Sequence, residues 1–444
     1  MRADVGVASR RAADPPETVQ TGGRTLLIVG AVVAAVAAVL YVVALATHPM
    51  DAMLKGFDLQ VYLGGAHEAL HHSHSLYSWE FASNGVKHPG IQFTYTPFAA
   101  LAFAAGLALP FTGLMAVVTV VSLFSLVATI WIAFRQLGWE KTSRLGATML
   151  LSGLLLWTEP VQRALFLGQV DLVLMALVTW DLCQPGRRRW KGAATGLAAG
   201  VKLVPLLFIG YLLVTGRFRQ ASAGLAAFAV TVAAGWAALP AASARWWLGG
   251  GFFSAGRTGF VGGQQNQSLR GLVTRLAGSV HGGELPWLLL ALVTGALGLA
   301  AAAALHRGGR PLAGLAACAL TALLVSPVSW DHHWVWVAPG LALAADAAAR
   351  AAGAARAGWL ALAAGLCAVF GAWPEFWSRP AGLLGAGLIN YAPATAWAYG
   401  DNPAYREYHW HALQLVAGNA EILAGLAAFA VLLVTAIRTS QPWS

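Results

Sequence analysis

The residues best suited to chemistry lie in a polar, histidine-rich segment, residues 48–97, of an otherwise apolar chain. Near its centre a single carboxylate, Asp58, stands between the aromatic residues Phe57 and Tyr62. Burial beside aromatic groups raises the pKa of a carboxylate, and such a group can act as a general base. Asp58 is therefore predicted to be a general base, with Tyr62 orienting the substrate. The alternative is a helix N-cap or a loop ion pair with Lys55.

A second polar segment, residues 159–171, carries Glu159, Arg163, Gln169 and Asp171 between two apolar stretches. Ionisable groups at a membrane boundary are costly and usually functional. We expect Arg163 to bind an anionic group and the other three to bind or orient a substrate. The alternative is that these residues only mark a turn at the membrane surface.

A lone lysine, Lys202, interrupts the apolar stretch 192–215, next to Pro205. A lysine near the bilayer midplane suggests contact with an anionic substrate, and a proline beside it suggests two half-helices that meet there. A structural ion pair with Asp171 or Glu159 is the alternative.

A long polar segment, residues 241–284, combines four arginines with a pair of tryptophans and an amide-rich run. Arginine forms bidentate contacts to phosphate, so a phosphate or an anionic lipid headgroup would account for these cations. A solvated loop over anionic lipid is the alternative. The residues concerned are Arg245, Arg257, Arg270, Arg275, Trp246, Trp247 and 264–268; of these, Arg270 is predicted to bind phosphate and Gln265 and Asn266 to bind or orient the substrate.

The densest polar cluster, residues 326–334, contains Asp331, His332 and His333. Adjacent histidines cannot share a helix face, whereas helical zinc pairs use i, i+4 spacing. We therefore expect His332 to donate a hydrogen bond to an anion, with Asp331 and His333 orienting groups around it. The histidines at 71, 72 and 74 lack a partnering carboxylate pattern, so no metal site and no cofactor are predicted.

The elements that must position these residues are membrane helices. The 444 residues are 58% hydrophobic and only 10% charged, as in a polytopic membrane protein. The three cysteines fall in apolar stretches and suggest neither disulfides nor a zinc cluster. Although the net charge is +10, the cations fall mainly in alternate loops, which indicates cytoplasmic loops and not nucleic-acid binding.

About 10–12 transmembrane segments are predicted, in an all-α integral membrane domain over residues 26–437, because a span needs about 20 apolar residues. Residues 1–25, a disordered tail, and 438–444 are expected in the cytoplasm, with residues 48–97, 241–284 and 374–410 as external loops. The stretch 98–109 is too short to cross and is expected to be a re-entrant or surface helix. Spans are expected at 26–47, 112–134, 145–158, 170–183, 192–215 (kinked), 221–240, 285–305, 312–326, 334–349, 357–373 and 411–437.

Several of these motifs, in this order, resemble glycosyltransferase family 87. The resemblance covers most of the chain, and its last motif is the most specific. The motifs are Phe57-Asp58-Leu59-Gln60-Val61-Tyr62, Phe93-Thr94-Tyr95-Thr96-Pro97, Glu159-Pro160, Gly168-Gln169-Val170, Val201-Lys202-Leu203-Val204-Pro205, Asn266-Gln267-Ser268-Leu269-Arg270-Gly271 and Ser326-Pro327-Val328-Ser329-Trp330-Asp331-His332-His333-Trp334.

The resemblance implies a GT-C-type membrane enzyme with a catalytic first external loop that carries juxtamembrane helices. It further implies inverting transfer of mannose from polyprenyl-phosphate-mannose to a mannose hydroxyl of a phosphatidylinositol mannoside, forming an α-1,2 linkage at the outer face of the cytoplasmic membrane. Asp58 matches the position of the base. Many members have Asn where this chain has Asp171, so Asp171 is either an orienting group or a charge partner of Lys202 or Arg163.

The residues independently suit sugar transfer. An oxocarbenium-like transition state needs a base on the acceptor side and cationic donors for the departing phosphate. Candidates for the latter are His332, Lys202, Arg163 and Arg270. Another GT-C enzyme, such as a mannan-branching mannosyltransferase or an arabinosyltransferase, fits the same residues. A lipid or sugar-lipid transporter is a further alternative, although no inverted repeat is evident.

Overall fold

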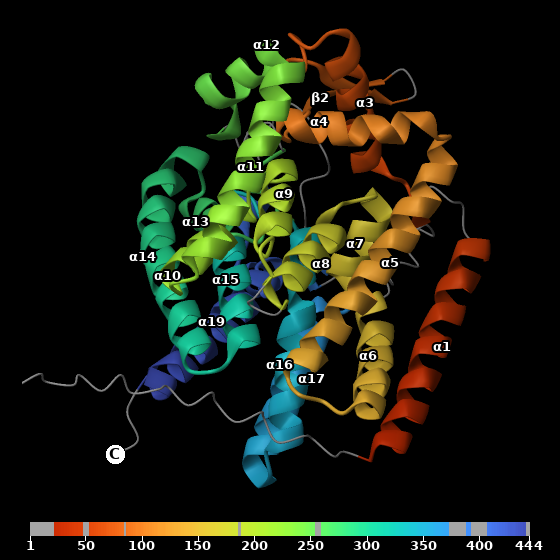
Figure 1. The fold of residues 1–444 in the computed structure, drawn as a ribbon, viewed down its shortest axis with the longest axis vertical. Coiled ribbons are helices and arrows are strands. Elements are labelled where there is room, and N and C mark those ends of the chain that lie inside the picture. The colour runs from red at the N-terminus through yellow and green to blue at the C-terminus, as the bar shows by residue number, and fades with distance from the viewer. Residues whose placement is uncertain are drawn as a thin grey trace, which may run out of the picture.

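The computed structural model describes residues 22–47, 53–83, 86–184, 188–253, 259–372, 388–391 and 406–440. Over these residues the chain is helical apart from one two-stranded hairpin, which confirms the predicted all-α class (Figure 1). Most of the predicted tails and of the predicted loop 374–410 fall outside the described residues, so those assignments stay predictions.

Six described helices are long and apolar enough to cross a membrane. A seventh span results if two short helices, α7 (Glu159–Leu167) and α8 (Asp171–Leu182), count together, although they are bent by 115°. The chain is therefore a multi-pass membrane protein. The six helices are α1 (Gly23–Thr47), α5 (Phe111–Gln136), α11 (Phe218–Ala238), α14 (Val280–Arg307), α17 (Gly353–Phe370) and α19 (Ala420–Ser440).

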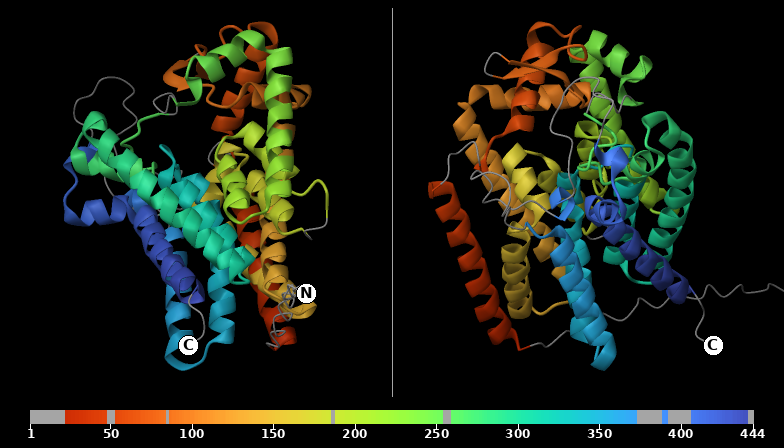
Figure 2. Two further views of the ribbon diagram at one scale, coloured as in Figure 1. Left: turned by 60° about the vertical axis from the view of Figure 1, so that its left-hand side comes forward. Right: turned by 180° about the vertical axis from the view of Figure 1, so that it is seen from behind.

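Other predicted spans form shorter helices that pack among the long ones (Figures 1 and 2). Most residues of α15 are buried, so its apolar sequence serves the protein interior as well as the membrane. The predicted pair of half-helices is confirmed, because α9 ends at Val201 and α10 begins at Leu206, on either side of Lys202. The shorter helices are α6 (Lys141–Leu156), α8, α9 (Ala193–Val201), α10 (Leu206–Val214), α15 (Pro311–Val325) and α16 (Val337–Arg350).

The first predicted loop folds into a small layer at one end of the molecule, where Figure 1 shows α3, β2 and α4 together. The stretch expected to be too short to cross is indeed short, as α4 (Pro97–Ala104) and the 3₁₀ turn η1 (Ala105–Ala108). The hairpin β1 (Glu80–Ser83) and β2 (Val86–Gln92) was not predicted. Its sequence signal was Asn84-Gly85, a dipeptide favoured in tight hairpin turns.

Small residues allow α1 to dock closely on α6. A Cβ atom added at Gly30 would lie 2.1 Å from the carbonyl oxygen of Gly146. Such close backbone approach is the usual role of glycine in membrane helix pairs. Because much of the rest of α1 is exposed and apolar, α1 is a peripheral anchor held mainly by one glycine-lined face.

Short elements connect the long helices around the predicted loop 241–284 and near the C-terminus. They include one π-helical turn, η2, which follows the end of α11 closely. The elements are α12 (Pro240–Ser243), η2 (Ala244–Leu248), η3 (Gly251–Phe253), α13 (Leu269–Ala277), η5 (Asp331–Trp336), η6 (Leu388–Tyr391), η7 (Arg406–His409) and α18 (Ala412–Gly418), with α3 (Phe57–His71) in the first loop.

Candidate active site

Asp58 lies in the first turn of α3, and the start of that helix is fixed by Gly56. Gly56 has a left-handed φ of 60°, and an added Cβ would lie 2.7 Å from the side chains of Phe111 and Met115. The Gly56 amide also donates to the carbonyl of Phe166, at 2.7 Å. Only glycine therefore fits this junction between the first loop, α5 and α7.

The carboxylate of Asp58 accepts a hydrogen bond from Nε2 of Gln169, which lies between α7 and α8. Gly56, not Asp58, is the N-cap of α3, and no ion pair with Lys55 occurs among the described residues. Neither structural alternative to the base assignment is therefore realised.

Two tyrosines hold Gln169 in this orientation. Its Oε1 accepts from the Tyr62 hydroxyl at 2.5 Å and from the Tyr95 hydroxyl at 3.3 Å, so its Nε2 is directed at the carboxylate. The two hydroxyls are 2.7 Å apart, and Tyr77 donates to the carbonyl of Tyr95 at 2.9 Å. Tyr95 was not among the predicted site residues, although it belongs to one of the quoted motifs.

Burial raises the pKa of the Asp58 carboxyl above its ordinary value. His332, Lys202 and Arg163 are near enough for their charges to oppose that rise, as does the hydrogen bond from Gln169. The predicted base and three of the four predicted phosphate-binding cations therefore belong to one cluster. A carboxyl with a raised pKa close to cations is an arrangement suited to general-base chemistry beside an anion.

Lys202 lies at the break between α9 and α10 and pairs with Asp171, with 2.6 Å between Nζ and Oδ1. Its Nζ is also 2.9 Å from Nε2 of His333. The proposed charge partner of Asp171 is therefore Lys202 in this structure, and Lys202 itself is partly committed to a structural pair.

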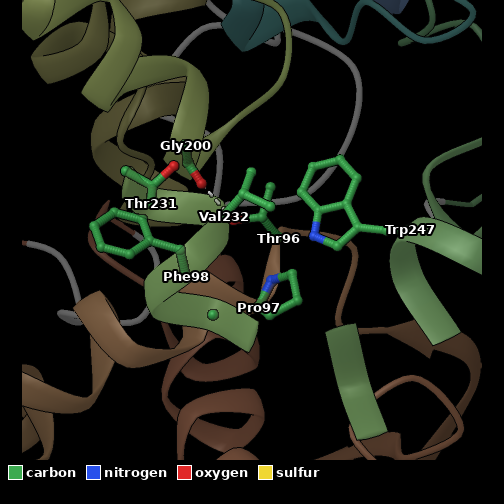
Figure 3. A pocket seen from close by; sticks show the side chains of 8 residues that line it. Thr96, Pro97, Phe98, Gly200, Thr231, Val232 and Trp247 are labelled. Atoms are coloured by element: carbon green, nitrogen blue, oxygen red, sulfur yellow. Dashed lines mark hydrogen bonds between the residues drawn. The ribbon is translucent and has the colours of Figure 1, made fainter. Parts of the chain in front are cut away.

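A residue of the first loop holds the break between α9 and α10 in place. The hydroxyl of Thr96 donates to the carbonyl of Gly200, and Thr96 also caps α4 by accepting from the Ala99 amide at 3.1 Å. Figure 3 shows Thr96 and Gly200 beside Thr231 and Trp247, where α4, α9 and α11 meet. The gap between these side chains is too narrow for a water molecule, so it is a packing junction that positions Lys202 and not a ligand site.

Asp331 and His332, at the start of η5, form the opposite wall of the cluster. Asp331 Oδ2 is 3.2 Å from Nε of Arg163, and Asp331 Oδ1 is 3.0 Å from Nδ1 of His332. The carboxylate thus orients the imidazole through Nδ1. Nε2 of His332 has no hydrogen-bond partner among the described residues, although Asp171 Oδ2 lies 4.0 Å away. This buried nitrogen therefore has an unused hydrogen-bonding position.

Gln265 and Asn266 act on this wall through the backbone. The Gln265 carbonyl accepts from the Asp331 amide at 3.0 Å, and Oδ1 of Asn266 accepts from the Ser329 amide at 3.0 Å. The side-chain amide of Asn266 also donates to the carbonyl of Val261, at 2.8 Å. The position of η5 thus depends on the amide-rich run. That Gln265 and Asn266 bind or orient the substrate stays a prediction.

Arg275 holds that run in place from α13. Its guanidinium, in a residue only 2% exposed, donates to the carbonyls of Gly263 at 2.8 Å and Asn266 at 3.0 Å. It also donates to Oδ1 of Asn419 at 2.6 Å. All these acceptors are neutral, so Arg275 is a structural arginine.

The remaining predicted residues divide between the cluster and its surroundings. Glu159, only 1% exposed in the first turn of α7, interacts electrostatically with Arg163. Arg270 is instead paired with Glu284 at 3.3 Å and stacks over Trp287, and no described contact joins it to Asp58. Sequence reasoning missed Glu421, which is fully buried at the start of α19 near Glu159. No motif identified it.

Three side chains are spaced as metal ligands. Ligand atoms of Asp171, His332 and His333 all lie within 4.8 Å of one another. Nζ of Lys202, however, contacts both Asp171 and His333, and an ammonium group there competes with a cation for the same ligands. The donor set therefore fits a metal poorly. The expected absence of a metal requirement remains a prediction.

Comparison with known proteins gives the family. The model of glycosyltransferase family 87 matches residues 93–327. A polyprenol-phosphate-mannose-dependent alpha-(1-2)-phosphatidylinositol pentamannoside mannosyltransferase of Mycobacterium tuberculosis is 35% identical over 349 residues, which are 76% of this chain and 79% of that protein. The chain belongs to glycosyltransferase family 87.

Other relatives agree. A protein with the same description in Mycolicibacterium smegmatis is 35% identical over 64% of this chain and 67% of its own length. A polyprenol-phosphate-mannose-dependent alpha-(1-2)-phosphatidylinositol mannoside mannosyltransferase of M. tuberculosis is 31% identical over 56% of this chain and 61% of its own length. No solved structure matches significantly. The predicted membership of family 87 is confirmed, and the transporter alternative is not favoured.

Proposed function

We propose that this family 87 enzyme transfers mannose from polyprenyl-phosphate-mannose to a mannose hydroxyl of a phosphatidylinositol mannoside, forming an α-1,2 linkage. The relatives are described as polyprenol-phosphate-mannose-dependent alpha-(1-2) mannosyltransferases acting on phosphatidylinositol mannosides, which supports this donor, acceptor and linkage. The observation that carries the proposal to this chain is the cluster in which Asp58 lies close to His332, Lys202 and Arg163.

In the proposed reaction Asp58 removes the proton from the acceptor hydroxyl. The acceptor oxygen then bonds to C1 of mannose from the face opposite the phosphate, while the bond from C1 to the phosphate oxygen breaks. The configuration at C1 inverts, from a β-linked donor to an α-linked product. The electron pair of the broken bond leaves on the polyprenyl phosphate. The proton stays on Asp58 until solvent takes it.

The departing phosphate gains charge in the transition state, so it needs donors aligned in advance. Nε2 of His332 has no described partner, and Asp331 fixes the orientation of its ring. We propose that Nε2 of His332 donates a hydrogen bond to an oxygen of the departing phosphate. Arg163 lies beside His332, held by the other oxygen of Asp331. Lys202 adds positive charge while paired with Asp171. Since Arg270 is paired with Glu284, we give it no direct role with the donor.

The cluster is proposed to open on the external face of the cytoplasmic membrane, with both termini in the cytoplasm. Charge supports this orientation: the ends of α5, α14 and α16 that lie away from the first loop carry Arg135, Arg307 and Arg350, as the positive-inside rule predicts for cytoplasmic ends. The helices α3 and α4 and the strand β2 of the first loop lie together at the opposite end (Figure 1).

The test is reconstitution of the purified protein with radiolabelled polyprenyl-phosphate mannose and phosphatidylinositol-mannoside acceptors, beside the variant Asp58→Asn. Label should reach the acceptor with wild type and be reduced to near background with the variant, which should still bind donor. Glu68→Gln is a matched control, because Glu68 is a carboxylate on the same helix that accepts from Ser75. Full activity of Asp58→Asn would refute the base assignment. No transfer by the wild type would refute this donor and acceptor pair.

A further inference from the structure

A cavity of about 290 Å³ opens on the first-loop layer, apart from the Asp58 cluster. Tyr77, Ser78 and Gln92 line it on one side, and Arg245 with the glycines at 249–251 lines it on the other. The glycines contribute no side chain, so the space between the two walls stays open. None of the described residues that line it is acidic.

The cavity contains one cation in a defined position. Arg245 Nη1 donates to the hydroxyl of Ser78 at 3.2 Å, which joins η2 to the first loop. Behind it, Tyr77 stacks on Trp246 with ring centroids 4.9 Å apart. Of the four arginines of residues 241–284, Arg270 is paired with Glu284 and Arg275 is buried among carbonyls. Arg257 is outside the described residues. Arg245 is exposed and directed at the cavity.

The residues on either side of these glycines in the chain, here called the rim, are apolar and exposed. Leu248 and Phe253 are 79% and 78% exposed, and Phe252 lies against Phe253 with 4.0 Å between ring centroids. These residues belong to η2 and η3, which follow the candidate membrane span α11 after the short helix α12. Arginine beside exposed aromatic and aliphatic side chains, where a span leaves the bilayer, is typical of a surface that meets lipid headgroups.

We propose that this cavity binds the phosphate of a membrane lipid headgroup. Arg245 and the Ser78 hydroxyl contact the phosphate oxygens, and the rim of Leu248, Phe252 and Phe253 contacts the lipid's apolar part. Arginine donates paired hydrogen bonds to phosphate, and the absence of acidic groups among the described lining residues leaves its charge uncompensated until an anion binds. An amphiphile satisfies both walls, whereas a free phosphate would leave the rim in water.

The cavity is connected to the candidate active site by one side chain. Tyr77 lines the cavity, and its hydroxyl donates to the carbonyl of Tyr95, whose own hydroxyl contacts Tyr62 and Gln169. The bound lipid could thus be a bulk phospholipid or the acceptor glycolipid itself. The second source rests on the proposed function.

The first measurement is binding of dihexanoyl phosphatidylglycerol to the purified protein in detergent. Binding is monitored as broadening of the phosphorus NMR signal of the lipid. Arg245→Gln should weaken binding at least fivefold. Lys55→Gln, which removes an exposed cation elsewhere in the same layer, should bind as the wild type does. Equal binding by wild type and Arg245→Gln would overturn the proposal. Size-exclusion profiles establish that the variants are folded.

A second variant keeps the test decisive if Arg245→Gln fails to fold. Phe253→Ser changes only an exposed rim side chain and should also weaken binding of the lipid probe, whereas Leu70→Ser, at an exposed position of α3, should not. Binding unchanged in Phe253→Ser would remove the rim from the site and overturn the assignment to a lipid.

Acceptor kinetics distinguish the two sources. A raised KM for phosphatidylinositol mannoside in Arg245→Gln would identify the acceptor headgroup as the occupant. An unchanged KM, together with lost phosphatidylglycerol binding, would identify a bulk phospholipid. Because probe binding is measured without any transfer, it remains informative even if the proposed donor and acceptor are wrong.

Discussion

Nζ of Lys202 lies 2.6 Å from Oδ1 of Asp171 and 2.9 Å from Nε2 of His333, so the ammonium group contacts two of the three side chains that are spaced as metal ligands. The carboxylate of Asp171 thus has a charge partner within the protein. The same Lys202 also lies near enough to Asp58 for its charge to act on that carboxyl.

Breaking the pair from one side should destabilise the protein. Loss of one partner of a buried pair typically costs about 3–5 kcal/mol, because the other charge stays buried and unpaired. Lys202→Met should therefore lower the thermal unfolding midpoint clearly. The double variant Lys202→Met with Asp171→Asn should regain most of that loss. Additive losses in the double variant would show that the two groups are not coupled.

Chelation should leave activity nearly unchanged. The cluster supplies His332, Arg163 and Lys202 for the phosphate, and Lys202 competes with any cation at Asp171. Transfer is measured after treatment with EDTA and again after adding Mg²⁺ or Mn²⁺. Strong inhibition that a divalent ion reverses would contradict this expectation and make Asp171, His332 and His333 a metal site.

His332→Ala should lower kcat about 100-fold, the effect typical of removing one donor from a developing anion. The reason is the unpartnered Nε2, which we assign to the donor phosphate. The rate of single-turnover transfer from labelled donor measures this loss. His71→Ala, at an exposed position of α3, is the matched control and should be active. Unchanged kinetics of His332→Ala would remove this residue from the site.

The fall in activity at low pH, the acid limb of the pH–rate profile, should follow the protonation of the Asp58 carboxylate. A general base works only when ionised, so activity falls as pH drops through its pKa, which burial raises above the ordinary value. Gln169→Ala removes a donor to the ionised form and should move the acid limb to higher pH. A hydrogen bond to a charged group contributes about 1.5 kcal/mol or more, which corresponds to about one pH unit.

A glutamine on the same helix as Asp58 provides the control for that shift. The side-chain amide of Gln60 donates to the carbonyl of Lys55, at 3.1 Å, and no described contact joins it to Asp58, so Gln60→Ala should keep the wild-type profile. An acid limb of Gln169→Ala that stays in place or moves to lower pH would separate Gln169 from the titration of the base.

Gly30→Ala should loosen α1 from α6, because the new Cβ would lie 2.1 Å from the carbonyl of Gly146. Forcing extra volume into a close-packed contact typically costs about 1–3 kcal/mol. Thermal unfolding in detergent measures the loss. Gly113→Ala is the matched control, since a Cβ at that helical position meets nothing within 4 Å. Equal midpoints for the two variants would contradict the close contact.

The membrane class and the residues that form much of the cluster could be predicted from the sequence because ionisable residues are rare in apolar chains, whereas the role of Asp58 as the base stays a prediction. Asp58, His332 and Lys202 each stood out against apolar surroundings, and the structure brings them together. Neither Asp58 nor His332 lies within the stretch 93–327 that matches the family model, so their assignment depends on this proximity.

The parts that were not predicted depend on tertiary contacts. Arg270 looks the same in the sequence as Arg163, but only the fold pairs it with Glu284. Tyr95 acts through Gln169, which is 74 residues away. The expected span 312–326 corresponds to α15 (Pro311–Val325), but the burial of most of its residues by neighbouring helices could not be predicted from its apolar sequence.

The contact between Arg275 and Asn419 joins residues 144 positions apart, and it has a consequence for biosynthesis. Arg275 fixes the amide-rich run, and that run holds Asp331 and His332. The ribosome must therefore complete the chain beyond Asn419, at the start of α19, before this wall of the site can set. An enzyme truncated ahead of its last helix would be inserted in the membrane without a finished site, so it could not act on lipid-linked sugar prematurely.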